Sequence, residues 1–143
     1  MAHIRRIGRI QADTGGFTEF VPLPFVHQHA PIYLAGKARA GASFEENLRM
    51  HAVARILLDG LVPNIQVSWV KLGVQACQAI LRAGANDFGG TLMEETISRM
   101  AGAQWGIEMT PERFDDAIFA IDRTPAVRTT TYERAGSGAR RAS

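Results

Sequence analysis

The stretch SFEENLRMHAVARILLDGLVPNIQVSWVKLGVQACQAILRAG, residues 43–84, decides the fold, because a helix, a strand and a second helix follow one another in it. Ser43 and Glu46 have the S-x-x-E spacing of a capping box, in which each side chain satisfies a free backbone N–H of the other residue. The helix that begins there has an apolar stripe of Leu48, Ala52 and Ile56. Residues 64–70 then alternate apolar and polar side chains, which is typical of a strand.

The same alternation of elements continues in both directions from this stretch. Further strand patterns occupy residues 17–23 and 86–92, and helical patterns occupy residues 4–12, 74–84, 93–100 and 110–121. Thr110 and Pro111 are typical of the cap and the first position of that last helix. Strands that alternate with amphipathic helices predict an α/β fold with a parallel sheet and right-handed crossovers. Three strands make only part of such a sheet, so we expect the chain to begin in the middle of a fold.

The composition excludes several classes of protein. Sixteen Lys and Arg against fourteen Asp and Glu leave a net charge of +2, too balanced for a nucleic-acid-binding protein that works through a basic face. No apolar run approaches the ~20 residues of a membrane span, and the first residues lack the apolar core of a secretory signal, so we expect a cytoplasmic protein. The single cysteine, Cys77, excludes an internal disulfide and a metal site built on several thiolates of this chain.

Three blocks of the sequence resemble one family of radical S-adenosylmethionine (radical SAM) enzymes. They are TGGFTEFVPLPF at 14–25, NIQVSWV at 64–70, and GANDFGGT at 84–91, which is followed by Glu94 and Glu95. The family contains FO synthase, which forms a deazaflavin, and enzymes of the futalosine route to menaquinone. The stretch FVHQHAPIY at 25–33 resembles the tyrosine-using, CofH-type half of FO synthase in particular. The resemblance covers residues 3–133, nearly the whole chain.

The resemblance implies the last three βα units of a radical SAM (βα)8 TIM-type barrel, followed by a C-terminal helix. We expect residues 1–133 to form this part of the barrel domain and residues 134–143 to form a disordered tail. The resemblance also implies S-adenosylmethionine and a 4Fe-4S cluster as cofactors. The implied reaction transfers the 4-hydroxybenzyl group of L-tyrosine to 5-amino-6-(D-ribitylamino)uracil, a step in deazaflavin coenzyme biosynthesis.

The chain departs from the family pattern at the cluster. The family binds the cluster through a CxxxCxxC motif, and one cysteine cannot supply three thiolates. We therefore expect the cluster ligands and the N-terminal half of the barrel to lie outside this chain, and the chain to be inactive alone. Two alternatives stay open: a fragment of a menaquinone-route radical SAM cyclase, and a free-standing accessory or interaction chain without catalysis.

Candidate contacts for the substrates and S-adenosylmethionine lie at or after the strands, because the reacting groups of such barrels sit at the C-terminal ends of strands. Glu19 is a charge within a half-apolar strand, and it is either a ligand contact inside the barrel or a surface residue at a strand end. Gln66 and Ser68 share one strand face, which lines either the barrel interior or the solvent. Lys71 either steadies a substrate carboxylate or is a surface lysine.

The remaining candidates lie in or beside loops. His27 and His29 lack a third ligand at metal spacing, so we predict no metal site there and expect a hydrogen-bonding role or none. Asp87 and Thr91 flank two glycines of the third strand, a pattern that marks close approach of a ligand or another backbone. Glu94 opens the next helix, where it either contacts a ligand or stabilises the helix N-terminus.

Overall fold

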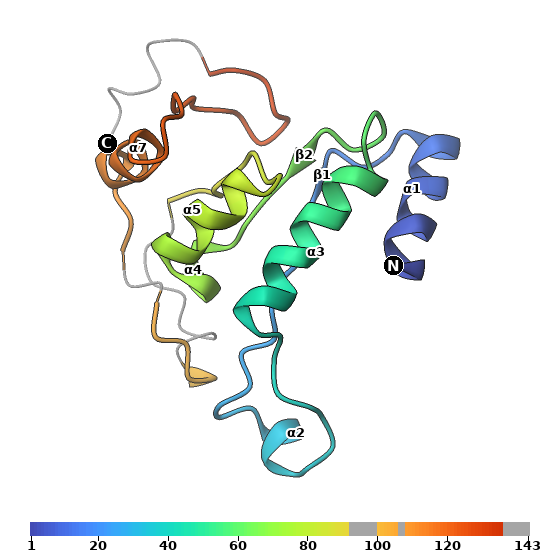
Figure 1. The fold of residues 1–143 in the computed structure, drawn as a ribbon, viewed down its shortest axis with the longest axis vertical. Helices are drawn as coiled ribbons and strands as arrows, with labels where there is room; N and C mark the ends of the chain where they lie inside the picture. The colour runs from blue at the N-terminus through green and yellow to red at the C-terminus, as the bar shows by residue number, and fades with distance from the viewer. Residues whose placement is uncertain (92–99, 106–107, 136–143) are drawn as a thin grey trace.

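The computed structural model describes residues 1–91, 100–105 and 108–135. Its elements, in chain order, are α1 (Ala2–Thr14), β1 (Glu19–Phe20), α2 (Pro31–Leu34), α3 (Phe44–Leu57), β2 (Asn64–Ile65), α4 (Trp69–Leu72), α5 (Val74–Arg82) and α7 (Pro111–Phe119) (Figure 1). This order of helices and short strands agrees with the expected α/β class. Most of the helix expected over 93–100, and residues 136–143 of the tail expected over 134–143, lie outside the described residues.

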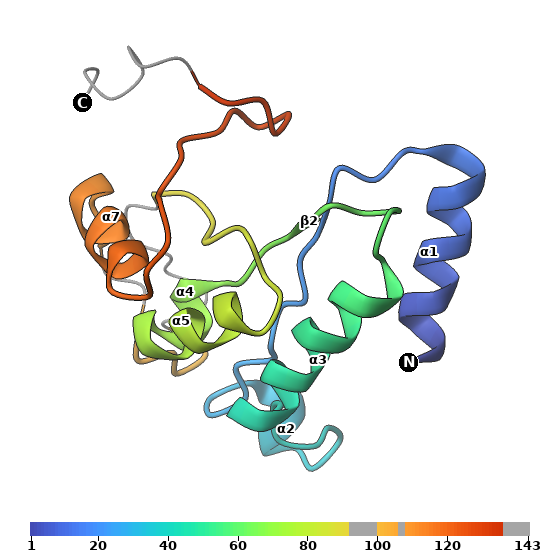
Figure 2. The same ribbon diagram turned by 45° about the horizontal axis from the view of Figure 1, so that its top comes forward.

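A short parallel sheet lies at the centre of the fold. β1 and β2 run parallel, with Glu19 opposite Asn64. A further parallel bridge joins Gln66 to Asp87, so a third extended segment belongs to the same sheet. The chain passes through α3 between β1 and β2, and through α4 and α5 between β2 and the third segment (Figure 2). The predicted alternation of parallel strands and helices is therefore present.

The strands are much shorter than predicted. β1 and β2 have two residues each, in place of 17–23 and 64–70. β2 does not reach residue 70, because Trp69 begins the helical turn α4 and its indole N–H donates to the Gly90 carbonyl at 3.1 Å. The strand predicted over 86–92 is wrong over the described residues 88–91, because Gly89 has a φ of +86°, outside the extended region.

The sequence signals at the helix ends are confirmed. The Glu46 N–H donates to Ser43 Oγ at 3.2 Å, and the Ser43 N–H donates to Glu46 Oε2 at 2.8 Å, which completes the capping box of α3. Thr110 caps α7, and Pro111 occupies its first turn. The loop between β1 and α3 contains the single helical turn α2. Within the described residues, no helix is long and apolar enough to cross a bilayer.

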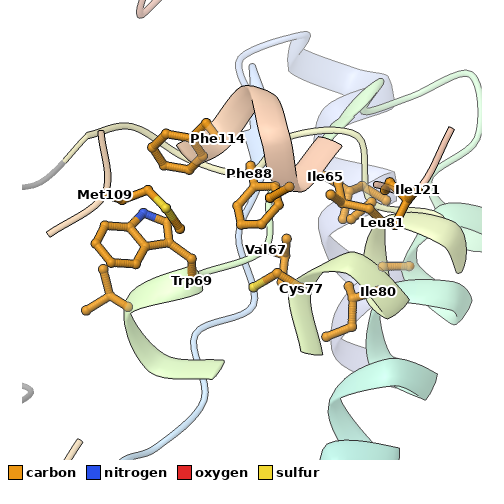
Figure 3. Packing of buried hydrophobic residues seen from close by; sticks show 14 of the residues in the cluster. Ile65, Val67, Trp69, Cys77, Ile80, Leu81, Phe88, Met109, Phe114 and Ile121 are labelled. Carbon is orange, nitrogen blue, oxygen red and sulfur yellow. The ribbon is translucent and has the colours of Figure 1, made fainter. Parts of the chain in front are cut away.

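The hydrophobic core fills the space between the sheet and helices α3, α5 and α7. Ile65 and Val67 of the sheet and Cys77 of α5 are fully buried there (Figure 3). The predicted stripe of α3 is wrong at Ile56, which is 74% exposed. That helix instead buries Asn47, His51 and Ala54.

Candidate active site

The pleat of the sheet separates a core face from a polar face. Ile65 and Val67 lie on the core face, so Gln66 between them lies on the opposite face. The register places Asp87 opposite Gln66 on one side. On the other side it places Glu19 opposite Asn64, which is two residues before Gln66. Side chains two residues apart share a face, so the sheet brings these three sequence candidates onto one polar face.

A C-terminal segment reaches this polar face. Residues 127–135, called here the C-terminal strap, follow α7 (Figure 1, red). The strap folds back on itself: the Ala135 N–H donates to the Val127 carbonyl at 3.0 Å, and the Thr129 N–H donates to the Glu133 carbonyl at 2.9 Å. These bonds fix the spacing of the side chains that meet the sheet.

Arg128 and Tyr132 of the strap hold two candidate carboxylates. Arg128 Nε–H donates to Asp87 Oδ2, and the Tyr132 hydroxyl donates to Glu19 Oε2. The Arg128 guanidinium lies 4.0 Å from the centroid of the Tyr132 ring, a cation–π contact. The Gly89 N–H donates to the other Asp87 oxygen at 2.6 Å. The carboxylates of Asp87 and Glu19 are therefore both hydrogen-bonded to other residues of this chain.

The protonation states of the strap follow from these contacts. Burial and the hydrogen bond with Glu19 raise the pKa of Tyr132 far above its ordinary value, so the phenol remains a donor. Burial by itself would lower the pKa of Arg128, but the hydrogen bond and the charge of Asp87 outweigh it and raise that pKa. The strap thus presents one permanent cation and one permanent O–H donor to two carboxylates.

Arg128 and Tyr132 were not among the sequence candidates. They lie in a polar segment with no recognised motif, 41 and 113 residues from the side chains that they bind. The sequence did carry a related signal, since a half-buried carboxylate such as Glu19 requires a partner. It could not say which of sixteen Lys and Arg, or which hydroxyl, supplies that partner.

Three other candidates follow β2 and the third extended segment. Ser68 directly precedes α4, and Lys71 lies within α4. Thr91 follows the third segment and is exposed. Because the strands are parallel, residues that follow them share the C-terminal end of the sheet. Glu94 lies outside the described residues.

The two candidate histidines lie in the loop between β1 and α3. His27 Nδ1 accepts a hydrogen bond from the Gly41 N–H at 3.0 Å, and its ring packs edge-on against Tyr33 with ring centroids 4.7 Å apart. The His29 backbone N–H donates to the Ala101 carbonyl at 2.9 Å, while the residue itself is exposed. The candidates therefore fall into a strap-bound group on the polar face and a group after the strands.

The described residues do not fit a 4Fe-4S cluster. Such a cluster requires cysteine thiolates, and Cys77 is fully buried on α5. Burial raises the pKa of its thiol to about 12, so it remains neutral. Among the residues that the structure describes, no three His, Cys, Asp or Glu side chains are grouped so that they could hold a metal ion.

An open cavity of about 550 Å³ lies between α4 and α7. Trp69, Trp105 and Met109 supply apolar walls, and Arg113 and Asp116 of α7 supply charges. Its lining contains none of the sequence candidates, so the cavity is distinct from both groups described above.

Comparisons with known proteins identify related sequences over almost the whole chain. The family model described as "CofH/MqnC C-terminal region" matches residues 14–139. An FO synthase of Mycobacterium leprae is 56% identical over 137 residues, which are 96% of this chain and 16% of that protein. The 5-amino-6-(D-ribitylamino)uracil--L-tyrosine 4-hydroxyphenyl transferase of Methanopyrus kandleri is 57% identical over 131 residues, 92% of this chain and 36% of that protein.

A transferase of the same name from Methanocaldococcus jannaschii is 54% identical over 131 residues, again 92% of this chain and 36% of the relative. The chain thus spans from about a sixth to about a third of the length of these curated relatives. The resemblance read from the three sequence blocks is confirmed, and the names of the relatives favour FO synthase over the menaquinone-route alternative.

Proposed function

The chain belongs to the family described as the CofH/MqnC C-terminal region, and we propose that it forms part of an enzyme of deazaflavin coenzyme biosynthesis. The proposed reaction transfers the 4-hydroxybenzyl group of L-tyrosine to 5-amino-6-(D-ribitylamino)uracil. The observation that carries the proposal is the 57% identity to a transferase with those two substrates in its name, over 92% of this chain.

The proposed architecture is the last three βα units of a (βα)8 barrel, with residues 1–133 in the barrel domain and residues 134–143 as a tail. The parallel pairing of β1, β2 and the segment at Asp87 supports this arrangement. The missing strands and the ligands of the 4Fe-4S cluster would come from outside this chain, since the described residues do not fit the cluster. We assign no reaction step on this chain to the cluster.

We assign the substrate and S-adenosylmethionine contacts to the candidates at the C-terminal end of the sheet. These are Gln66 on the polar face and the residues of the loops and turns that follow the strands: His27, His29, Ser68, Lys71 and Thr91. Glu94, which lies outside the described residues, is proposed for the same role from the sequence alone. Reacting groups in barrels occupy this end of the strands. Glu19 and Asp87, which the strap already holds, take a positioning role at the polar face.

A chimeric enzyme tests the proposal. The 131 matching residues of the M. kandleri transferase are replaced by those of this chain, and the purified, anaerobically reconstituted chimera is given S-adenosylmethionine, ring-labelled L-tyrosine and the aminouracil. We expect mass spectrometry to find the labelled 4-hydroxybenzyl adduct. A folded chimera that contains its cluster but forms no adduct, while the parent enzyme does, would contradict the proposal.

A further inference from the structure

The loop between β1 and α3 closes tightly on His27. Gly41 lies against the chain at Phe25, where a Cβ on residue 41 would lie only 1.9 Å from the Phe25 carbonyl oxygen. Only glycine allows this approach, and it brings the Gly41 N–H within 3.0 Å of His27 Nδ1. The loop therefore places a backbone donor on one particular nitrogen of the ring.

This backbone donor fixes the tautomer of the neutral His27 ring. A ring nitrogen that accepts a hydrogen bond must carry a lone pair, so Nδ1 is unprotonated and the proton resides on Nε2. The ring is also held by Tyr33, whose ring meets it at an interplanar angle of 75°, and by Phe25, whose centroid lies 6.4 Å away. Its orientation is therefore fixed as well as its tautomer.

His27 Nε2–H lacks a hydrogen-bond acceptor among the described residues, although the ring is only partly exposed. This N–H is an oriented donor in a loop that follows a parallel strand, where ligands of such sheets bind. The neighbouring His29 is different, because the residue is exposed and its two ring nitrogens make no hydrogen bond within the described part of the chain.

We propose that His27 is a specificity-determining residue, whose Nε2–H donates a hydrogen bond to an oxygen of a bound substrate. This inference rests on the proposed function, and it names the atom and its chemistry. The acceptor is either the carboxylate of L-tyrosine or a carbonyl or hydroxyl oxygen of the aminouracil. Gly41 is the positioning residue, since its N–H sets the tautomer of His27.

The variant His27→Asn separates the two nitrogens of the ring. The asparagine Oδ1 can replace Nδ1 as the acceptor for the Gly41 N–H, but no atom replaces the Nε2–H donor. Gln28→Asn, at an exposed residue of the same loop to which no substrate contact is assigned, is the matched control. Calorimetry on the reconstituted chimera measures the dissociation constants of L-tyrosine and the aminouracil separately.

We expect His27→Asn to weaken the binding of one of the two substrates, while Gln28→Asn leaves both dissociation constants within about twofold of the parent. The loss is about 10- to 100-fold for an anionic acceptor and about 3- to 10-fold for a neutral one. The affected substrate identifies the acceptor. Unchanged affinities in His27→Asn would overturn the inference and leave the proposed function intact, whereas a parent chimera that binds neither substrate would overturn both.

A second measurement does not depend on how the variants fold. Nitrogen-15 spectra of histidine-labelled protein distinguish a protonated from an unprotonated ring nitrogen. For neutral His27 we expect an unprotonated Nδ1 and a protonated Nε2. A proton on Nδ1 would overturn the inference, because the Gly41 N–H could then not be bonded to that atom.

Discussion

Replacing Arg128 with leucine removes the cation that the C-terminal strap supplies to the polar face. The Asp87 side chain is 7% exposed and that of Arg128 is 30% exposed. Loss of one partner from a buried ion pair costs about 3–5 kcal/mol, because it leaves the other charge buried and uncompensated. The partial exposure of Arg128 and the remaining bond from Gly89 to Asp87 reduce this cost, so we expect about 2–3 kcal/mol.

For a chain of this length, such a loss lowers the melting temperature by about 6–12 °C. Denaturant unfolding followed by circular dichroism measures the free energy. Arg134→Leu is the matched control, since this exposed arginine lies in the same strap and its side chain has no described partner. In the background of Asp87→Asn the cost of Arg128→Leu should fall below about 1 kcal/mol, because the buried charge is gone.

Equal unfolding free energies for Arg128→Leu and Arg134→Leu would refute the reasoning. So would strict additivity of Arg128→Leu and Asp87→Asn, because additivity means that the two side chains do not interact.

Three further predictions follow from titratable groups whose pKa is shifted by burial. Burial and the bond to Glu19 raise the pKa of Tyr132, so its contribution to stability is present below about pH 10 and is lost above it as the unfolded chain ionises. Between pH 9 and pH 11 the unfolding free energy should therefore fall less in Tyr132→Phe than in the parent, by a difference below about 1.4 kcal/mol per pH unit because the residue is partly exposed. Equal falls in the two proteins would contradict this prediction. Burial lowers the pKa of His51, so below about pH 6.5 the unfolded chain binds a proton at this ring that the native protein does not bind. From pH 7.5 to pH 5.5, the free energy of urea unfolding should fall by up to about 1 kcal/mol more in the parent than in His51→Leu. Parallel pH profiles for the two proteins would contradict a buried neutral ring. Burial raises the pKa of the Cys77 thiol to about 12, so at pH 8 the thiol should react with a thiol reagent only as fast as the protein unfolds. Rapid labelling of the native chain would contradict this, because it would show that the Cys77 thiol is accessible.

Helix positions and the order of elements could be predicted because their signals are local. The capping box at Ser43 and Glu46 involves residues three apart, and the Thr110–Pro111 cap involves neighbours. The polar face was predicted in part, since alternation along residues 64–70 placed Gln66 opposite the core. The family resemblance added a function that no local pattern contains.

The buried face of α3 could not be predicted, because polar side chains occupy it. Asn47 Nδ2–H donates to the Ser43 carbonyl at 2.9 Å, and His51 Nδ1 lies 2.7 Å from the Asn47 carbonyl, to which it donates. Both residues are thus hydrogen-bonded within their own helix, which allows them to be buried where periodicity favours apolar residues. Ile56 is left exposed as a result.

Strand lengths and the strap depend on contacts between distant residues. β2 ends before Trp69, which begins α4 and donates a hydrogen bond to the Gly90 carbonyl, and the third segment ends before a glycine with positive φ. Arg128 and Tyr132 meet their partners only after the whole chain has folded, so no window of sequence contains both members of either pair.

We place the substrates at the C-terminal end of the sheet, and we assign to the strap the role of holding Asp87 and Glu19 on the polar face. A crystal structure of the chimera with L-tyrosine and the aminouracil bound tests this most directly. We predict that the substrates contact the loop of His27 and the turn after Ser68, while Arg128 remains paired with Asp87 and Tyr132 with Glu19. Substrates bound directly to Asp87 and Glu19, with the strap displaced, would contradict the account.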